Sequence, residues 1–256
     1  MDPQLTYAIN RDGRIHVATT AKSAGVEKYI ISSSCSVYGR GEESHLSEKS
    51  KTNPISVYAK STLEAEQESL SLADNNFSVT ALRNATVFGL STRMRFDLVV
   101  NLMTLTAFQK SRIIVMGGGL QWRPLVHLSD VAKAFRVVIG EKKENVNQEI
   151  FNIGLDNFQI KNLAYLVREE MALNVEIDVA PDDADKRDYN VIFAKAEQKI
   201  GFKANFGVAQ GVKEIYMALK AGKVDVGPKT VTVQWYRNIL EAKSLLDSVS
   251  LDGRVI

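Results

Sequence analysis

Short apolar runs rich in β-branched residues alternate with longer amphipathic stretches in the first third of this 256-residue chain. Residues 28–34 and 77–84 have the composition of strands that are buried on both faces of a parallel sheet. Residues 3–24 and 55–73 are predicted to be helices. In the first helix the apolar or small positions follow a helical spacing and precede a stop at Gly25: Leu5, Ile9, Val17 and Ala21. This alternation predicts an α/β fold with a parallel sheet.

Beyond Gly89 the pattern is more mixed. In chain order we expect a helix over 97–110, a strand over 113–116, a hairpin turn at 117–119, a strand over 124–127, a helix capped by Ser129 or Asp130, a strand over 149–154, and helices over 160–173, 207–221 and 229–247. Residues 182–189 are predicted to be a charged loop. No internal repeat or low-complexity linker divides the chain, so the C-terminal part is expected to form a second lobe packed tightly on the first.

The composition narrows the functional class. With 45% hydrophobic and 24% charged residues, the chain has the make-up of an ordinary soluble globule. Its net charge of +2 and the absence of a long basic cluster predict no nucleic-acid partner. No apolar run approaches the ~20 residues needed to span a bilayer, and the opening Met-Asp-Pro-Gln-Leu is unlike a secretion signal. We therefore expect a cytoplasmic protein without a membrane partner.

The single cysteine and the three histidines predict no metal chemistry. Cys35 excludes an internal disulfide, and its place at an apolar strand end predicts a buried, inert thiol rather than a nucleophile. His16, His45 and His127 are scattered without the spacing of metal ligands.

A serine and a tyrosine form the main candidate for chemistry. Residues 32–39 read Ser-Ser-Ser-Cys-Ser-Val-Tyr-Gly, and Tyr58 opens the run Tyr-Ala-Lys-Ser-Thr-Leu-Glu-Ala-Glu on the next predicted helix. Ser34 at a strand end and Tyr58 on the following helix could transfer a proton when a secondary alcohol is oxidised or a carbonyl reduced. Either residue alone is better explained by packing, but their order and context favour the proton-transfer couple.

The couple lacks its cation. A tyrosine with a pKa of ~10 needs a nearby cation to act as a base near pH 7. A lysine four residues later would share its helix face, but that position is Thr62. Lys60, two residues later, is about 200° around the helix.

These segments resemble the extended short-chain dehydrogenase/reductases, the NAD-dependent sugar-nucleotide epimerase/dehydratase family, in a form similar to UDP-galactose 4-epimerase. Further segments follow in the family's order over nearly the whole chain. Asn10–Gly13 resembles the family's Asn-x-x-Gly helix, and Leu82–Gly89 resembles its strand into the substrate lobe. Trp122–Asp130 resembles the family signature Arg-Asp-Phe-x-His-Val-x-Asp. Asp185–Tyr189, with Lys195 and Gly201, resembles its C-terminal loop and ending.

The resemblance implies a role for each matching position. Ser34 would bind the reacting sugar oxygen, Tyr58 would be the acid/base, and Asn10, Tyr58 and Thr62 would lie against the cofactor, NAD or NADP. The substrate, a nucleotide sugar, would meet Ser34, Thr86, Asn101, Arg123 and Arg187, with the two arginines on its pyrophosphate. Surface ion pairing is the alternative for both arginines. His127 and Asp130 are expected to orient a turn and cap a helix rather than to catalyse.

The resemblance also implies an architecture. Residues 1–88 would be the C-terminal part of a Rossmann-type dinucleotide-binding domain that lacks its first strands. Residues 89–256 would be mainly a smaller α+β substrate lobe, with crossings back to the sheet. Helices 3–24 and 55–73 would form the seam of a homodimer, and a sheet edge left bare would favour association or poor stability.

Three departures from the family pattern limit the expected activity. The family opens with a glycine-rich loop that binds the dinucleotide, and this chain starts after it. The glycines 117–119 do not replace that loop, because no helix is predicted to start behind them. Thr62 replaces the family's lysine, and Cys35 and Ser36 replace the acidic pair of its dehydratases, so elimination is not supported.

Two functions therefore stay open. One is an NAD(P)-dependent epimerase or reductase acting by hydride transfer, impaired in this form. The other is a non-catalytic, degenerate member that binds a nucleotide sugar or a protein partner. The sugar and the choice between NAD and NADP are not encoded in the motifs that this chain retains.

Overall fold

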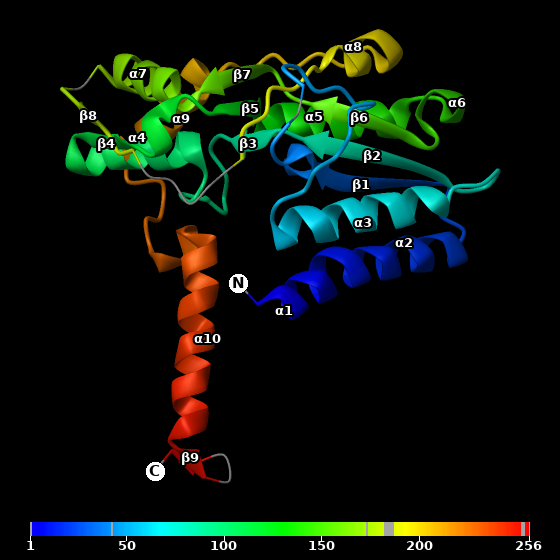
Figure 1. The fold of residues 1–256 in the computed structure, drawn as a ribbon, viewed down its shortest axis with the longest axis horizontal. Helices are drawn as coiled ribbons and strands as arrows, with labels where there is room; N and C mark the ends of the chain where they lie inside the picture. Colours follow the sequence, from blue (N-terminus) through cyan, green and yellow to red (C-terminus); the bar gives the residue numbers. More distant parts are fainter. Residues whose placement is uncertain (1, 42, 173, 182–186, 252–253, 256) are drawn as a thin grey trace.

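The chain folds into two α/β regions, and one long helix extends from them (Figure 1). A computed structural model describes residues 2–41, 43–172, 174–181, 187–251 and 254–255. Within these residues, no helix is both long and apolar enough to cross a membrane.

The first region is built on a parallel sheet in the order β1-β2-β6. β1 (Lys28–Ser34) pairs along its length with β2 (Ser78–Asn84), which pairs with β6 (Glu149–Ile153). All seven residues of β2 are buried, as expected for a central parallel strand. The predicted strands 28–34 and 77–84 are confirmed to within one residue, and so is the α/β class with a parallel sheet.

Helices cover both faces of this sheet (Figure 1). On one face, α3 (Val57–Ser71) packs on β1 and β2, with Ile31, Ala65 and Ala81 in the contact. On the other face lie α5 (Leu128–Gly140), the short α6 (Lys143–Val146) and α8 (Ala194–Ile200). The predicted helix 55–73 is therefore confirmed, slightly shorter at both ends.

The predicted helix 3–24 is one helical run with an irregular centre. It comprises α1 (Pro3–Tyr7), the π-helical η1 (Ala8–Gly13) and α2 (Arg14–Ser23), and it ends before Gly25, whose φ is 78°. The run lies beside α3, and its apolar positions Leu5, Ile9 and Val17 are 47%, 61% and 56% exposed. The helical spacing was correct, but these three side chains do not enter the core.

The second region contains two small sheets. β5 (Trp122–His127) pairs in parallel with β3 (Thr86–Phe88) and antiparallel with β7 (Asp156–Gln159). β4 (Arg112–Val115) pairs in parallel with β8 (Glu176–Val179). Three helices pack around a common apolar core with these strands: α4 (Val99–Lys110), α7 (Ile160–Met171) and α9 (Val208–Lys220).

Two local predictions in this region were wrong. Gly117–Gly119 is not a hairpin turn, because β4 and β5 on either side pair with other strands. It is a short helical turn, η3, with positive φ values of 63°, 72° and 77° that favour glycine. α5 is capped neither by Ser129 nor by Asp130, because the His127 side chain accepts the Ser129 N–H at 3.2 Å.

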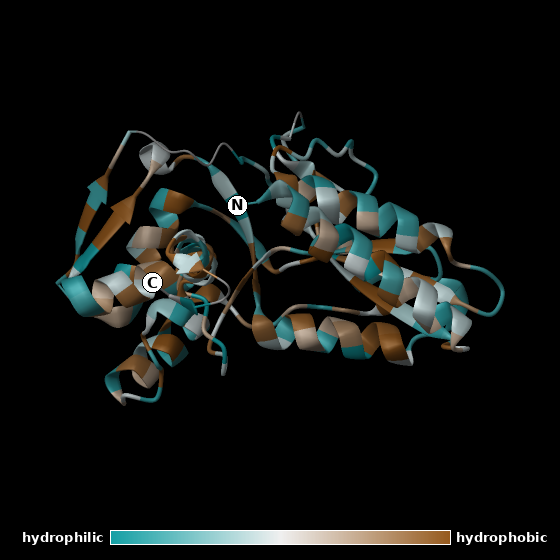
Figure 2. Cartoon of the chain, turned by 90° about the horizontal axis from the view of Figure 1, so that it is seen from below, coloured by the Kyte–Doolittle hydropathy of each residue, from teal (hydrophilic) through white to brown (hydrophobic). Residues whose placement is uncertain are grey.

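The chain ends in a helix that stands apart. After η4 (Pro228–Thr230), α10 (Thr232–Ser248) extends away from both regions, followed by the short strands β9 (Ser250–Leu251) and β10 (Arg254–Val255) (Figure 1). Figure 2, turned by 90°, looks along α10 near the label C. The predicted helix 229–247 is confirmed with a later start. Of the predicted charged loop 182–189, residues 182–186 lie outside the described part.

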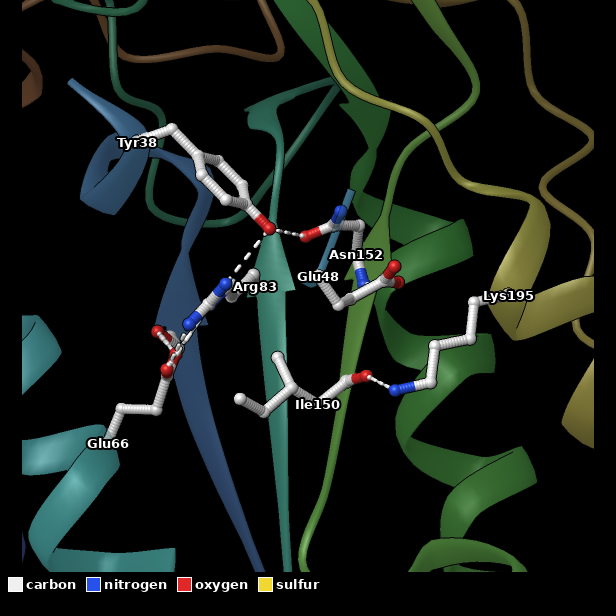
Figure 3. Close-up of polar contacts among 8 residues, drawn as sticks. Tyr38, Glu48, Glu66, Arg83, Ile150, Asn152 and Lys195 are labelled. Carbon is white, nitrogen blue, oxygen red and sulfur yellow. Dashed lines mark hydrogen bonds and ion pairs between the residues drawn. The ribbon is translucent and has the colours of Figure 1, made fainter. Parts of the chain in front are cut away.

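Side chains close one outer edge of the parallel sheet. On β6, the Asn152 N–H donates to Glu48 Oε1 at 2.8 Å, and the Ile150 carbonyl accepts from Lys195 Nζ at 2.6 Å (Figure 3). Satisfying these backbone groups blocks the addition of a further strand at β6.

A close contact between α9 and β3 offers a test of the packing. A Cβ at Gly211 in α9 would lie 2.5 Å from the Phe88 ring, so Gly211→Ala should destabilise the protein by about 1–3 kcal/mol, measured by urea unfolding. The matched control is Gly140→Ala at the end of α5, where a Cβ meets nothing within 4 Å. We expect this control to be neutral or slightly stabilising. Equal losses for the two variants would contradict the packing.

Candidate functional site

The candidate site lies at the carboxyl end of the parallel sheet. Ser34 is the last residue of β1 and pairs in register with Asn84, the last residue of β2. Ligands of open α/β sheets bind outside the carboxyl ends of the strands. The polar strand-end residues therefore lie where the fold class places its ligands.

Ser34 is fixed by the turn that follows it. Its Oγ accepts the Ser36 N–H at 3.2 Å and thereby caps the short helix η2 (Cys35–Tyr38). The hydroxyl hydrogen is not used by this bond. Ser34 is half-buried, so its hydroxyl keeps the capacity to donate to a bound oxygen.

Tyr58 stands in the first turn of α3. Ser56 caps this helix by accepting the Ala59 N–H at 3.1 Å, and α3 packs against β1 and η2. The Tyr58 side chain is 37% exposed and makes no hydrogen bond, ion pair or ring contact with any described residue. Its phenol is thus open to solvent, and among the described residues no hydrogen bond joins it to Ser34.

One turn later the same helix faces the interior. Thr62 is fully buried, and its Oγ1 has no hydrogen-bond partner among the described residues. Lys60, between Tyr58 and Thr62, is exposed. The position where a cation would assist Tyr58 therefore holds a neutral, enclosed side chain.

A buried ion pair supports this part of the fold. Glu66, two turns after Tyr58 on α3, receives three bonds from Arg83 of β2: Nε to Oε1 at 3.2 Å and to Oε2 at 3.0 Å, and Nη2 to Oε1 at 2.6 Å (Figure 3). Ser33 Oγ, beside Ser34, donates to Glu66 Oε2 at 2.5 Å. The exposed fractions of Glu66 and Arg83 are 0% and 4%. Glu66 thus links the helix that carries Tyr58 to β2 through Arg83, and to β1, the strand that ends in Ser34, through Ser33.

The network continues to β6 through Tyr38. Arg83 Nη1 donates to Tyr38 Oη at 2.9 Å, and Tyr38 Oη donates to Asn152 Oδ1 at 2.8 Å (Figure 3). Burial raises the pKa of the Tyr38 phenol, so it stays protonated and can donate. Sequence reasoning assigned no role to this network. For Arg83 the signal was present, because it is the only charged residue of the run Ser78–Asn84, whereas Glu66 stands between Glu64 and Glu68 on a polar helix and nothing in the sequence marked it as buried.

Cys35 belongs to the same buried region. Its thiol donates to the Arg83 carbonyl at 3.1 Å, and its exposed fraction is 1%. Burial raises the pKa of the thiol, which disfavours the reactive thiolate. The expected buried cysteine is confirmed.

The two candidate phosphate-binding arginines lie next to each other. The Arg123 guanidinium donates to the Arg187 carbonyl at 2.5 Å and to its neighbour Trp122's carbonyl at 2.8 Å. It lies 5.9 Å from the Tyr189 ring centroid and is 5% exposed. Arg123 is thus engaged within the protein and joins β5 to the segment after residue 186.

The remaining candidates form local bonds. Asn101 is buried and accepts the Gly89 N–H at 3.2 Å, which fixes the turn after β3. Asn10 donates to the Thr6 carbonyl at 3.2 Å within its own helical run. Thr86 opens β3 and is half-buried. None of these bonds joins the three residues to Ser34 or Tyr58.

His127 and Asp130 both bond within the protein, but it is His127, not Asp130, that caps α5. His127 Nδ1 accepts the Ser129 N–H, so Nε2 carries the proton and donates to Glu214 at 2.8 Å. Asp130 Oδ2 accepts the N–H groups of Asn205 and Phe206 at 3.0 and 2.9 Å. In the described part of the chain, no three His, Cys, Asp or Glu side chains gather to hold a metal ion.

Comparison with known proteins shows the family of this chain. Residues 1–154 match the model of the NAD dependent epimerase/dehydratase family, more than half of the chain. The chain belongs to this family. Over 246 residues it is 28% identical to a dTDP-D-glucose 4,6-dehydratase of Mus musculus. That match covers 91% of this chain but 62% of the relative, so the chain spans less than two thirds of the relative's length.

Solved structures of the family share the fold. A UDP-glucose 4-epimerase of Thermotoga maritima with UDP-glucose superposes with a TM-score of 0.78 at 23% identity, covering 87% of this chain and 73% of its own. A UDP-glucuronic acid 4-epimerase of Bacillus cereus in complex with UDP-glucuronic acid and NAD gives a TM-score of 0.73 at 20% identity, covering 83% and 67%. The α/β fold is therefore that of Rossmann-like epimerases.

The Glu66–Arg83 pair predicts a large and specific loss of stability. Arg83→Met leaves a buried carboxylate without its cation and should cost about 3–5 kcal/mol in urea unfolding. Adding Glu66→Leu removes that carboxylate and should restore much of the loss. As a control, Lys243→Met breaks the exposed pair with Asp247 on α10 and should leave the unfolding free energy unchanged within error. A loss for Arg83→Met no larger than the control would refute this role.

Cys35 provides a test by thiol labelling. Because burial raises its pKa, the native protein should react with a thiol-specific disulfide reagent far more slowly at neutral pH than the unfolded chain. Ser244→Cys on exposed α10 adds a matched thiol that should react at once in the native state. Rapid native labelling of Cys35 itself would contradict its placement.

Proposed function

We propose that this protein acts on a nucleotide sugar by reversible hydride transfer at a secondary alcohol, with Ser34 and Tyr58 as the proton-transfer couple. The observation that carries the proposal is the exposed, unpartnered Tyr58 phenol on the helix that packs beside the strand ending in Ser34. The family membership and relatives with UDP-sugars support the same class of substrate.

In this proposal the hydroxyls of Ser34 and Tyr58 have different roles. Ser34 donates its free hydroxyl hydrogen to the sugar oxygen while its Oγ stays fixed by the Ser36 N–H. Tyr58 accepts the proton of the alcohol during oxidation and returns one during reduction. The elements that carry the two groups are joined at Glu66 of α3, which bonds to Ser33 of β1 and to Arg83 of β2, and this supports a fixed arrangement of the two hydroxyls.

The cofactor positions fit NAD or NADP only in part. When bound, the nicotinamide would accept and return the hydride. Tyr58 is exposed and can contact such a ring, whereas Thr62 is buried and Asn10 is bonded to Thr6. Position 62 supplies no cation to stabilise a phenolate, so we propose slow turnover.

The alternative is a non-catalytic member that binds a nucleotide sugar or a partner. The neutral, enclosed Thr62 is the observation that favours it. On this alternative, Arg123, Arg187, Asn101 and Thr86 would still serve substrate binding. Binding without any change in nicotinamide absorbance would distinguish it from the enzyme.

We further propose a homodimer in the cytoplasm, formed through residues 3–24 and 55–73. The exposed apolar side chains of Leu5, Ile9 and Val17 on the first of these segments support an interface there. The single free cysteine is compatible with a reducing compartment.

The test combines binding and turnover. With NAD and either UDP-glucose or dTDP-glucose, we expect slow formation of reduced nicotinamide, and Tyr58→Phe should lower its rate by roughly 10²–10⁴-fold. Tyr165→Phe, at 38% exposure on α7, is the matched control and should keep the rate. Nucleotide-sugar binding without reduction would favour the alternative. Failure to bind either NAD or a nucleotide sugar would refute the enzyme and the sugar-binding form of the alternative.

A further inference from the structure

Asn84, the last residue of β2, carries a buried oxygen without a hydrogen bond. The side chain is 6% exposed, and its Oδ1 has no partner among the described residues. The Nδ2 of the same amide donates to Ser32 Oγ at 3.1 Å and to the Ser33 carbonyl at 3.4 Å. Buried polar atoms are nearly always bonded, so the free oxygen of this otherwise bonded amide needs an explanation.

The amide lies on the same face of the sheet as Ser34. Ser33 Oγ donates to Glu66, so Ser33 points to the face that α3 covers. Because successive side chains of a strand alternate between faces, Ser32 and Ser34 point to the other face. Asn84 pairs in register with Ser34, and its bond to Ser32 Oγ places its amide on that other face too. Asn84 is therefore the neighbour of Ser34 across the two strands.

Asn84 also marks the end of the apolar core on this face. Two residues earlier on β2, Leu82 belongs to a buried apolar cluster with Ile153 of β6, the residue that pairs with Asn84. On β1, by contrast, Ser32 is exposed and Ser34 is half-buried. The amide thus lies at the boundary between the packed core and the carboxyl end of the sheet, where ligands of this fold class bind.

A second buried hydroxyl beside Ser34 is also without a partner. Ser36 is 4% exposed, and its N–H donates to Ser34 Oγ. Its own Oγ bonds to no described residue. Polar groups in the interior are costly when they are left unbonded. Two such atoms next to one half-buried serine indicate a ligand that completes their bonds.

We propose that Asn84 is a specificity residue whose Oδ1 accepts a hydrogen bond from a hydroxyl of the sugar in the bound nucleotide sugar. This role rests on the proposed function, in which Ser34 bonds the reacting sugar oxygen. A sugar ring carries hydroxyl groups on carbons next to the reacting one, so a sugar held at Ser34 presents an O–H donor to the adjacent strand end. A carbonyl oxygen only accepts, and it therefore selects a sugar with that hydroxyl over one without it.

The first experiment measures the binding of UDP and UDP-glucose to the full chain by calorimetry. The ratio of the two dissociation constants isolates the contribution of the sugar. Asn84→Leu removes the acceptor and should lower this ratio roughly 3- to 10-fold, the usual effect of one hydrogen bond, while UDP binding stays unchanged. Asn84→Ala is the second variant, because its small side chain cannot clash with the core if leucine does not fit.

Two control variants separate loss of the acceptor from damage to the fold. Ser32→Ala removes the hydroxyl partner of Asn84 Nδ2 but leaves Oδ1, so the ratio should be kept. Asn157→Leu removes an amide of β7 whose Oδ1 and Nδ2 both bond to the backbone of Val191. It should lower the unfolding midpoint without changing the ratio.

The second experiment identifies the hydroxyl group. UDP-glucose analogues that each lack one sugar hydroxyl are compared in the unmodified protein and in Asn84→Leu. One analogue should bind the unmodified protein roughly 3- to 10-fold more weakly than UDP-glucose does, yet bind the variant as well as UDP-glucose does.

Three results would overturn the proposal. An unchanged ratio in both Asn84 variants, with UDP-glucose still bound, would remove Asn84 from sugar recognition and leave the proposed function intact. Weaker binding of NAD to Asn84→Leu, with no change for an NAD analogue that has an acetyl group in place of the carboxamide, would assign Oδ1 to the cofactor. An unmodified protein that binds no nucleotide sugar would refute the proposed function, and this role of Asn84 with it.

Discussion

The buried pair of Glu66 and Arg83 is the constraint on which the candidate site depends. It bonds α3 to β2, reaches β1 through Ser33, and reaches β6 through Tyr38 and Asn152. Removing two charges from water is costly, and the cost is offset only because nearly every polar atom of the network has a partner. The arrangement therefore admits little movement between the strand that ends in Ser34 and the helix that carries Tyr58.

The elements that position Ser34 and Tyr58 match the family pattern more fully than the groups that would assist catalysis. The strand end, the capped turn and the exposed tyrosine are all in place, yet the next turn of α3 presents a neutral, buried Thr62. A tyrosine acid/base needs electrostatic help more than it needs geometry, because its pKa is far from neutral. α3 thus holds Tyr58 in a fixed position but lacks the positive charge that would make Tyr58 an efficient acid/base.

The edge of the parallel sheet is covered, whereas two helical segments expose apolar side chains. Glu48 and Lys195 satisfy the backbone of β6 at the outer edge of the sheet, so that edge is closed within the chain. By contrast, apolar side chains stay in water on two other elements: Leu5, Ile9 and Val17 on the first helical run, and Leu245 and Leu246 on α10. Hydrophobic area of this kind favours association, and the two patches lie on different elements.

The sequence by itself determined the elements and the family. Apolar runs and helical spacing predicted the strands and helices of the first region, because each pattern follows the repeat of the element along the chain. The motifs around Ser34 and Tyr58 identified the family, and the apolar setting of Cys35 predicted its burial. These features are local, and local sequence specifies them.

Only the tertiary structure decided which elements meet. The Gly117–Gly119 turn does not join a hairpin, since its flanking strands pair with β8, β3 and β7, which are distant in sequence. Glu66 and Arg83 form a pair across 17 residues, and Arg123 bonds to Arg187 across 64. The spacing of α10 and of residues 3–24 predicted helices correctly but not that their apolar sides would stay exposed. Pairing and exposure depend on contacts between remote segments, and periodicity along one segment does not encode them.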